Sequence, residues 1–331
     1  FLTPVFGRIP SRPTNPSLTL THYQKLDYLN GGDPNTTTDL GVTGIWLMPI
    51  FASASYHGYD STDYYGINPQ YRTMEDFQKL LEEAHKRGIR GIIDLVINHT
   101  SDQHPWFKDA KRDKDSKYRD WNLWNETDPG YKGPWNQRVW RSSTTGFYYG
   151  IFTANMPDLN FDNRQVTKEI EKIMGFWLTD IGVDGFRIDA AKHLFESDGK
   201  VENVPATHEW FAEFYRGYKT ITPEAYTVGE VYGAGGFIAS TYRGQLDHIF
   251  NFELASGFVN SAKGESNTGV NSAYAFTLKD APDGDYATFL TNHDQNRVMT
   301  VLNGNVAKAK VAATLLTAPG SPFLYYGEES A

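Results

Sequence analysis

Three carboxylates in this sequence each stand at the end of a short apolar segment: Asp189, Glu230 and Asp294. Segments of this kind, rich in β-branched and aromatic residues, are typical of buried strands. Acids at the ends of successive parallel strands can converge on one pocket when the strands lie side by side in a barrel. Two carboxyl groups in one pocket can act as nucleophile and proton donor, which is the chemistry of glycoside hydrolysis.

The residues beside two of these acids indicate how each would ionise. Arg187 lies two positions before Asp189, so on a strand both side chains point to the same face. There the guanidinium would lower the pKa of the carboxyl and keep it ionised, as a nucleophile requires. Two valines and a glycine surround Glu230, which would raise its pKa and make it a proton donor at neutral pH. A structural ion pair at Asp189 and a merely hydrogen-bonded strand end at Glu230 are the alternatives.

Two further strand ends carry polar pairs that could bind sugar hydroxyls. His293 precedes Asp294, and Asn98 precedes His99; a structural role for each histidine is the alternative. The chain has no cysteine, no Gly-x-Ser-x-Gly turn and no His-Glu-x-x-His motif. Acyl transfer and zinc-dependent hydrolysis are therefore disfavoured, and acid/base chemistry on a sugar is favoured.

The order of elements predicts the fold that would position these residues. Strands are expected near 44–50, 91–97, 183–189, 226–231, 246–252, 286–292 and 322–327. Helices at 74–87, 167–180, 207–219 and 306–317 separate most of them. This alternation predicts an α/β fold with a parallel sheet, and about eight such units close a (β/α)8 TIM barrel. An open doubly wound sheet is the alternative, although no strand is followed by a Gly-x-Gly-x-x-Gly or phosphate loop.

One segment, 100–161, breaks the alternation. It combines a run of charges at 108–120 with many aromatic residues, and an insertion after the strand at 91–97 explains it. We expect most of its aromatic side chains to form a small core of their own. The predicted division is therefore 1–99 and 162–331 for the barrel and 100–161 for the inserted domain.

Both ends of the sequence depart from a complete barrel. Residues 1–20 contain four prolines and read as a loop, so no first strand is recognised there. The sequence also stops soon after the last predicted strand, without room for an eighth helix. We therefore expect a fragment of a longer protein.

The composition narrows the class of partner. The 331 residues are 40% hydrophobic and 21% charged, with a formal net charge of −9, as in a folded globular protein. The chain has no obvious basic face and no apolar run of about 20 residues, so nucleic acid and membrane are poor partners. A neutral ligand fits better. Aromatic residues make up 15% of the chain and suit sugar rings, although core packing accounts for most of them.

The motifs around these residues resemble those of the alpha-amylase family, glycoside hydrolase family 13, and most of all its bacterial members. The segment 94–99 is similar to the first family motif, 185–193 to the second, 227–231 to the third and 289–294 to the fourth. The resemblance covers most of the chain. It implies a (β/α)8 TIM barrel with a small domain, domain B, inserted after the third strand, and a C-terminal β-domain that is absent from this chain.

The resemblance also implies roles for individual residues. Asp189 would be the nucleophile, Glu230 the acid/base and Asp294 the stabiliser of the transition state. Substrate contacts would come from Tyr59, His99, Arg187, Lys192, His193 and His293. Many relatives hold a structural Ca²⁺ ion, for which the ligands here would be Asn98, Asp158 and the backbone carbonyl of His193.

The activity implied is a double displacement on α-1,4-glucosidic bonds of starch or maltodextrins, with retention of configuration. Tyr56 and His57 stand where many exo-acting α-glucosidases carry an aspartate, which favours an endo-acting alpha-amylase. An α-glucosidase or oligo-1,6-glucosidase, a cyclomaltodextrinase and a trehalose synthase are close alternatives, and a non-catalytic carbohydrate-binding relative is a distant one. We expect an α-glucan as partner, a monomer, and an extracellular or periplasmic location, with the cytoplasm as the alternative.

Overall fold

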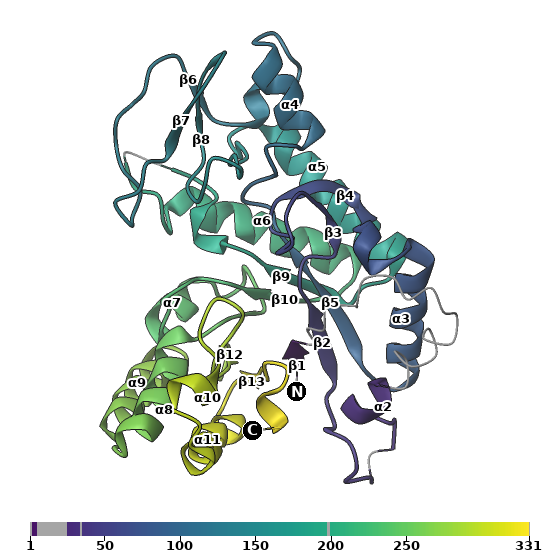
Figure 1. The fold of residues 1–331 in the computed structure, drawn as a ribbon, viewed down its shortest axis with the longest axis vertical. Helices are drawn as coiled ribbons and strands as arrows, with labels where there is room; N and C mark the ends of the chain where they lie inside the picture. The colour runs from purple at the N-terminus through teal and green to yellow at the C-terminus, as the bar shows by residue number, and fades with distance from the viewer. Residues whose placement is uncertain (1, 5–24, 34, 197–198, 331) are drawn as a thin grey trace.

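Parallel strands arranged around a barrel form the centre of the molecule (Figure 1). The computed structural model describes residues 2–4, 25–33, 35–196 and 199–330. Within these residues the barrel strands, in chain order, are β1 (Leu2–Pro4), β2 (Gly44–Leu47), β5 (Arg90–Leu95), β9 (Gly185–Ile188), β10 (Tyr226–Gly229), β11 (His248–Ile249), β12 (Ala287–Thr288) and β13 (Ser321–Pro322). The first six form one parallel sheet in this order, and β12 pairs with β13. A parallel bridge between Phe250 and Ala287 connects the two sheets.

Helices connect most of these strands. They are α2 (Leu26–Leu29), α3 (Met74–Lys86), α5 (Arg164–Gly175), α6 (Pro205–Ile221), α7 (Gly236–Thr241), α8 (Phe252–Gly264), α9 (Thr268–Asp280), α10 (Val298–Val301) and α11 (Val306–Ala312). Short helical turns are η1 (Pro69–Tyr71), η2 (Arg119–Trp121), η3 (Phe176–Ile181), η4 (Ala191–His193), η5 (Ala313–Thr317) and η6 (Glu328–Ser330). Local chemistry fixes their ends: Thr73 caps α3 through the N–H of Asp76 in a capping box, and Gly88 follows it with φ 71°.

Two excursions from the barrel supply parts of the candidate site. The antiparallel hairpin of β3 (Phe51–Ser53) and β4 (Ser61–Ile67) follows β2. After β5 comes the predicted inserted domain, with α4 (Pro105–Arg112) and a sheet of β6 (Trp124–Asn125), β8 (Gly146–Tyr149) and β7 (Trp140–Ser143). Figure 1 shows it at the top, far from α8 to α11. It has its own core, which includes Val139, Trp140 and Tyr149. The insertion after the third barrel strand is thus confirmed, while the boundaries 100 and 161 remain a prediction.

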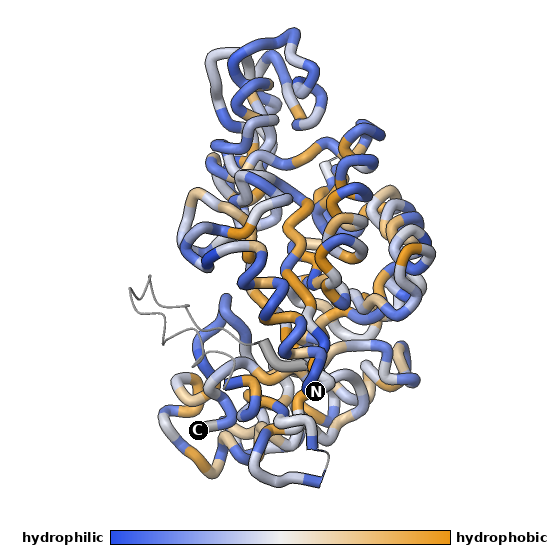
Figure 2. The backbone as a smooth tube through the Cα atoms, turned by 90° about the vertical axis from the view of Figure 1, so that its right-hand side faces the viewer, coloured by the Kyte–Doolittle hydropathy of each residue, from blue (hydrophilic) through white to orange (hydrophobic). Residues whose placement is uncertain are grey.

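Side chains on the barrel strands alternate between two apolar cores, as the two-residue repeat of a strand requires. Trp46, Ile92 and Val228 belong to the inner core. The positions next to them on the strands, such as Ile93, belong to the core between strands and helices. Burial on both faces explains the nearly continuous apolar runs in the sequence, and Figure 2 shows the strands as orange segments through the middle of the molecule.

Gly185 permits the close approach of two neighbouring strands at their beginning. Its φ is 149°, and a Cβ atom at this position would collide with the carbonyl of Tyr226 on β10. A glycine is therefore required where β9 enters the sheet. This brings the two strands that end in Asp189 and Glu230 into direct contact.

Each of the seven predicted strands overlaps an observed one, but all seven are shorter than predicted because the chain soon leaves the sheet. The last prediction, 322–327, overlaps β13 only at Pro322. The prediction that the N-terminal segment holds no strand is wrong at Leu2–Pro4, which pairs in parallel with Gly44, Ile45 and Trp46. Pairing with β2 sets the position of this strand, so three residues can form it without a periodic apolar pattern in their own sequence. The rest of the predicted loop 1–20 lies outside the described residues. No described helix has the length and apolar character needed to cross a membrane.

Candidate active site

Arg187 lies at the centre of a cluster of acids inside the barrel. Only 1% of its side chain is exposed, and it is in register with Asp94 on β5. Its Nη1 donates to both carboxylate oxygens of Asp94, at 3.0 and 3.1 Å, and to Asp189 Oδ1 at 2.6 Å. Its Nη2 lies 3.3 Å from Glu230 Oε2. One guanidinium therefore binds carboxylates from three neighbouring strands.

The main chain holds Asp189 and Glu230 side by side at the ends of β9 and β10. Directly after Asp189 the chain turns at Ala190, whose φ of 48° lies in the left-handed region that residues with a side chain rarely adopt. This turn directs the N–H of Ala190 toward Glu230 Oε2, at 3.2 Å. The N–H of Ala191 donates to the carbonyl of Glu230 at 3.0 Å. Two backbone donors thus fix one acid relative to the other.

Burial raises the pKa of both Asp189 and Glu230, and the positive charge of Arg187 opposes the rise. The predicted increase at Glu230 is confirmed. The predicted decrease at Asp189 is wrong, because Arg187 is shared among three carboxylates and one positive charge does not offset the burial of three negative ones. Such a cluster favours retention of a proton, which an acid that protonates a leaving group requires.

Asp94 is a further member of the acid cluster, for which the sequence motif alone predicted no role. It is fully buried, and besides Arg187 it accepts hydrogen bonds from the hydroxyl of Tyr59 at 2.9 Å and from Trp46 Nε1 at 3.3 Å. Burial raises its pKa to about 7, while the hydrogen bonds and Arg187 act in the opposite direction. A lone carboxylate within the apolar run of β5 was the signal that could have identified it, since a buried charge needs a partner.

Tyr59 and His293 connect the β3–β4 hairpin to the loop after β12. Their rings are nearly parallel, with centroids 5.5 Å apart and an interplanar angle of 7°. The hydroxyl of Tyr59 lies 2.7 Å from His293 Nε2 and donates to Asp94. Burial lowers the pKa of His293 to about 3, so its imidazole is neutral at pH 7 and Nε2 can donate to the tyrosine oxygen. Both predicted substrate contacts therefore border the acid cluster.

Asp294 is the most accessible of the three predicted catalytic acids. Its side chain is 55% exposed, its Oδ2 lies 3.5 Å from His293 Nε2, and its N–H donates to Asn292 Oδ1 at 3.0 Å. Partial burial raises its pKa, and the negative charge of Glu230 adds to the increase. Asp294 therefore stands at the open side of the cluster, close enough to Glu230 for the two carboxyl groups to influence each other's ionisation.

Three other predicted substrate contacts lie near the acids but are buried within the protein. His99 Nε2 is 3.0 Å from the carbonyl of Tyr59, and His193 Nδ1 is 2.8 Å from the carbonyl of Val201. Burial lowers the pKa of each histidine to about 4, so both are neutral at pH 7. Lys192 donates to the carbonyl of Tyr232 at 3.2 Å. Contacts of these three residues with sugar remain predictions.

The predicted calcium ligands lie where the inserted domain meets the barrel. Asn98 Nδ2 donates to Asp158 Oδ2 at 3.1 Å, whereas Asn98 Oδ1 is buried without a hydrogen-bond partner. Burial raises the pKa of Asp158 to about 7. The ring of Phe152 contacts His99 and His193, with centroid distances of 5.3 and 5.7 Å, which places His193 nearby.

An unpaired amide oxygen beside a buried carboxylate fits a hard cation such as Ca²⁺. Within the described residues there is no cluster of three or more histidine, cysteine, aspartate or glutamate side chains that could hold a metal. A site at Asn98 and Asp158 would therefore depend on amide and carbonyl oxygens in addition to one carboxylate.

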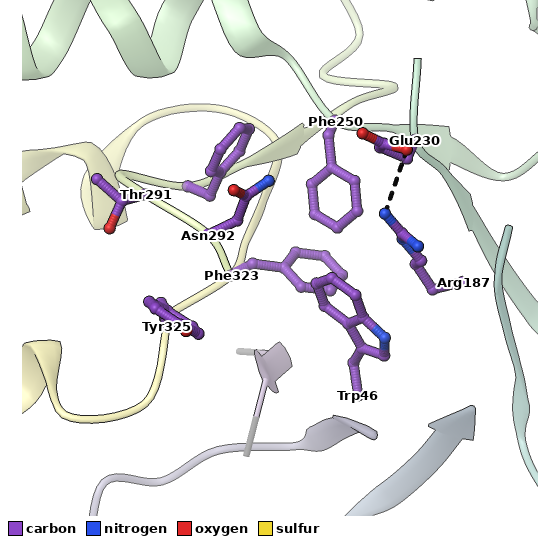
Figure 3. A pocket seen from close by; sticks show the side chains of 9 residues that line it. Trp46, Arg187, Glu230, Phe250, Thr291, Asn292, Phe323 and Tyr325 are labelled. Atoms are coloured by element: carbon purple, nitrogen blue, oxygen red, sulfur yellow. Dashed lines mark ion pairs between the residues drawn. The ribbon is translucent and has the colours of Figure 1, made fainter. Parts of the chain in front are cut away.

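A small cavity lies beside the ion pair of Arg187 and Glu230 (Figure 3). The aromatic rings of Trp46, Phe250 and Phe323 line it, and Thr291, Asn292 and Tyr325 approach from the loops after β12 and β13. The apolar rings exclude water from the inner side of the two charged groups. This explains why burial is the largest influence on the pKa of Glu230.

Comparisons with known proteins agree with this geometry. The model of the alpha-amylase catalytic domain matches residues 23–331. Alpha-amylase 3 of Dictyoglomus thermophilum is 44% identical over 310 residues, which are 92% of this chain and 58% of that protein. A trehalose synthase of Pimelobacter sp. and an oligo-1,6-glucosidase of Heyndrickxia coagulans are 33% and 36% identical, each over 92% of this chain and 61% of the relative.

The same relationship is found among solved structures. An alpha-amylase from H. orenii superimposes with a TM-score of 0.88 and 45% sequence identity, over 99% of this chain and 68% of that one. The chain spans 58 to 61% of the length of the relatives named above. Sequence, fold and acid cluster agree, and the chain belongs to the alpha-amylase family of glycoside hydrolases.

Proposed function

We propose that the protein is an alpha-amylase, a retaining hydrolase that cleaves α-1,4-glucosidic bonds in starch and maltodextrins. One observation carries the proposal: the guanidinium of Arg187 holds Asp189 at 2.6 Å and Glu230 at 3.3 Å, at the ends of adjacent strands. Two carboxylates bound to one guanidinium favour the short separation of about 5 Å used by retaining enzymes over the longer one of inverting enzymes. Alpha-amylases are also among the relatives, at 44% and 45% identity.

In the first step Asp189 attacks the anomeric carbon while Glu230 gives its proton to the glycosidic oxygen. Burial raises the pKa of Glu230, which favours the protonated carboxyl that this role requires. The hydrogen bond from Arg187 orients Asp189 for the attack and stabilises its negative charge. Loss of the leaving sugar leaves a glycosyl group bound to Asp189.

In the second step Glu230, now ionised, takes a proton from water, and the water oxygen displaces Asp189 from the anomeric carbon. Asp294, exposed at the edge of the cluster, would stabilise positive charge on the sugar ring in both transition states. The neutral His293 and the hydroxyl of Tyr59 supply uncharged hydrogen-bonding groups for sugar hydroxyls.

Related activities are the second candidates, because a trehalose synthase and an oligo-1,6-glucosidase are 33% and 36% identical to this chain. A product profile separates them from an alpha-amylase. We expect mixed oligosaccharides from starch and no cleavage of isomaltose. Glucose as the single product, cleavage of isomaltose, or conversion of maltose to trehalose would each contradict the proposal in favour of a relative's activity.

Two substitutions test the separate roles of the acids. Asp189→Asn and Glu230→Gln should each lower kcat on starch by about 10³-fold or more. With a maltosyl fluoride, whose leaving group needs little protonation, Glu230→Gln should regain much of its rate of glycosylation and Asp189→Asn should not. Glu213→Gln, in an exposed ion pair with Arg164, is the control and should remain active. Full activity of either acid variant would refute the mechanism.

We also propose that Asn98, Asp158 and the carbonyl of His193 hold a structural Ca²⁺ ion. Two observations support this: Asn98 has a buried oxygen without a partner, and burial raises the pKa of Asp158. A bound cation would give the oxygen a partner and would stabilise the negative charge of the carboxylate. When bound, the ion would connect the inserted domain to the barrel and would take no part in the chemical steps.

Thermal unfolding tests the calcium proposal without an activity measurement. Calcium should raise the Tm of the unaltered protein, because an ion that binds only the folded state stabilises it. Asp158→Asn should abolish this response, and in EDTA at pH 8 it should not be less stable than the unaltered protein, since a buried carboxylate has been removed. Asp162→Asn, four residues away and exposed, should keep the response. An identical Tm with calcium and with EDTA would contradict the proposal.

A further inference from the structure

Trp135 differs from the other tryptophans of this protein. All eight lie within the described residues, and Trp135 is the one that is largely exposed, at 52%. Trp140 on the same domain is 8% exposed, and Trp124 stacks on Phe107 inside that domain. An exposed tryptophan presents a large flat apolar ring together with a polar N–H, and such a ring is available to a ligand.

The loop that carries Trp135 is held in place by several hydrogen bonds. The N–H of Trp135 donates to Gln137 Oε1 at 2.9 Å, and the N–H of Gly133 donates to the carbonyl of Gln137 at 2.9 Å. The amide of Gln137 in turn donates to the carbonyl of Ile151 at 3.0 Å. The ring of Phe152 stacks against the indole, with centroids 5.8 Å apart. The exposed face is therefore presented by a fixed structure.

A row of contacts leads from this face toward the segment that follows the acid/base. The indole meets the edge of His193 at 5.8 Å, and the neighbouring Lys192 pairs with Glu202 at 2.9 Å. The ammonium of Lys192 also donates to the carbonyl of Tyr232, which is 54% exposed and stands two residues after Glu230.

These groups combine apolar faces with hydrogen-bonding edges. The two rings offer flat surfaces to the C–H face of a sugar, and the carboxylate of Glu202, 34% exposed, offers acceptors for hydroxyls. The row begins at Tyr232, two residues after the acid that would protonate the leaving oxygen, which favours the side of the departing sugar.

We propose that Trp135 is a sugar-binding platform on the inserted domain, which extends the leaving-group side of the site beyond Tyr232. It binds a glucosyl unit at least two positions past the cleaved bond. The protein thereby selects long malto-oligosaccharides over short ones. This inference rests on the proposed function, since it requires an α-glucan substrate.

Kinetics on malto-oligosaccharides of increasing length test the platform. In the intact protein, Trp135→Ala should lower kcat/KM for maltoheptaose about tenfold and change that for maltotriose less than twofold. Trp135→Phe, which keeps a flat ring, should restore most of the loss. Phe276→Ala removes an aromatic ring that is 56% exposed on α9 and serves as the matched control without effect. An equal loss for both substrates, or no loss, would overturn the inference.

Binding and product analysis distinguish a failure of this inference from a failure of the proposed function. In an Asp189→Asn background, Trp135→Ala should weaken maltoheptaose binding by about tenfold in calorimetry and leave maltotriose binding unchanged. Maltoheptaose labelled at its reducing end should yield shorter labelled fragments with Trp135→Ala than with the unaltered protein. Activity of the unaltered protein with no effect of Trp135→Ala refutes the platform alone. Absence of any α-glucan turnover in the unaltered protein refutes the proposed function.

Discussion

The two sides of the candidate site are held in different ways. At the ends of β9 and β10 the side chains of Asp189 and Glu230 are only 11% and 13% exposed, and both are bound to Arg187. In the loop after β12, Asp294 is 55% exposed. The first side is complete before substrate arrives, because its charges are positioned by buried partners. On the second side, the exposed side chain of Asp294 is free to adjust when a ligand binds.

The open side is nevertheless anchored behind Asp294. Thr291 Oγ1 donates to Glu328 Oε1 at 2.5 Å, and the N–H of Tyr325 donates to Glu328 Oε2 at 3.2 Å. Glu328 thus connects the loop after β12 to the loop after β13. The buried side should therefore couple activity to stability, whereas the open side should separate them.

The largest effect is expected at the centre of the buried side. Arg187→Lys should lower kcat by about 10³-fold or more, because a single ammonium cannot bind three carboxylates in the geometry of a guanidinium. It should also lower the free energy of unfolding by about 3 to 5 kcal/mol, since buried carboxylates lose their partner. Starch hydrolysis and urea unfolding measure the two changes.

Arg90→Lys is the matched control for this prediction. Arg90 is at the beginning of β5, 68% exposed and paired with Asp184 at 2.8 Å, so its replacement should change stability by less than about 1 kcal/mol. If Arg187→Lys lost activity but kept full stability, the buried side would not couple the two properties.

On the open side we expect a smaller loss of activity and no loss of stability. Asp294→Asn should lower kcat by about 10²- to 10³-fold, the usual cost of one electrostatic contact in a transition state. Its Tm should stay close to that of the unaltered protein because the side chain is 55% exposed. Asp285→Asn, 41% exposed near the beginning of β12, is the control and should change neither property. A large decrease in Tm for Asp294→Asn would remove the distinction between the two sides.

The smallest effect is expected at Glu328, which connects the two loops behind the open side. It is an effect on stability, and it depends on pH. Burial raises the pKa of Glu328 to about 7, so the folded state holds its proton between pH 4.5 and 7 while the unfolded state releases it. Stability from this group is therefore present at low pH and is lost as pH rises to about 7, by at most ~3 kcal/mol.

Thermal unfolding at pH 5 and pH 8 isolates this contribution. The Tm of the unaltered protein should decrease more between these pH values than the Tm of Glu328→Gln, which does not titrate. Glu265→Gln replaces an exposed glutamate that pairs with Lys308, and it should behave like the unaltered protein. Parallel Tm changes in all three proteins would show that Glu328 does not hold its proton as described.

The sequence was sufficient for the barrel and for the acids at its strand ends. Buried strands produce recognisable apolar runs, and the acids interrupt those runs where the chain leaves the sheet. The register between strands could not be predicted, because pairing is set by contacts between residues far apart in the chain. The partnership of Asp94 and Arg187 depends on this register, and so does the shared charge that raises the pKa of Asp189.

Elements with weak local patterns were also missed. Pro4 obscures β1, whose strand conformation is supplied by pairing with β2. Helix α9 buries only Ala273 and Thr277 along its length, so it has little of the apolar periodicity by which helices are recognised. Such elements are stabilised by their neighbours rather than by their own sequence.

The turn at Ala190 has a consequence for divergence within the family. The spacing between Asp189 and Glu230 is kept by main-chain donors at Ala190 and Ala191, which persist whatever side chains surround them. Substitutions in the loops that contact the rest of a substrate can therefore accumulate without disturbing the pair. A trehalose synthase and an oligo-1,6-glucosidase are 33% and 36% identical to this chain, and a turn of this kind would keep the acid pair in place while the rest of the site changes.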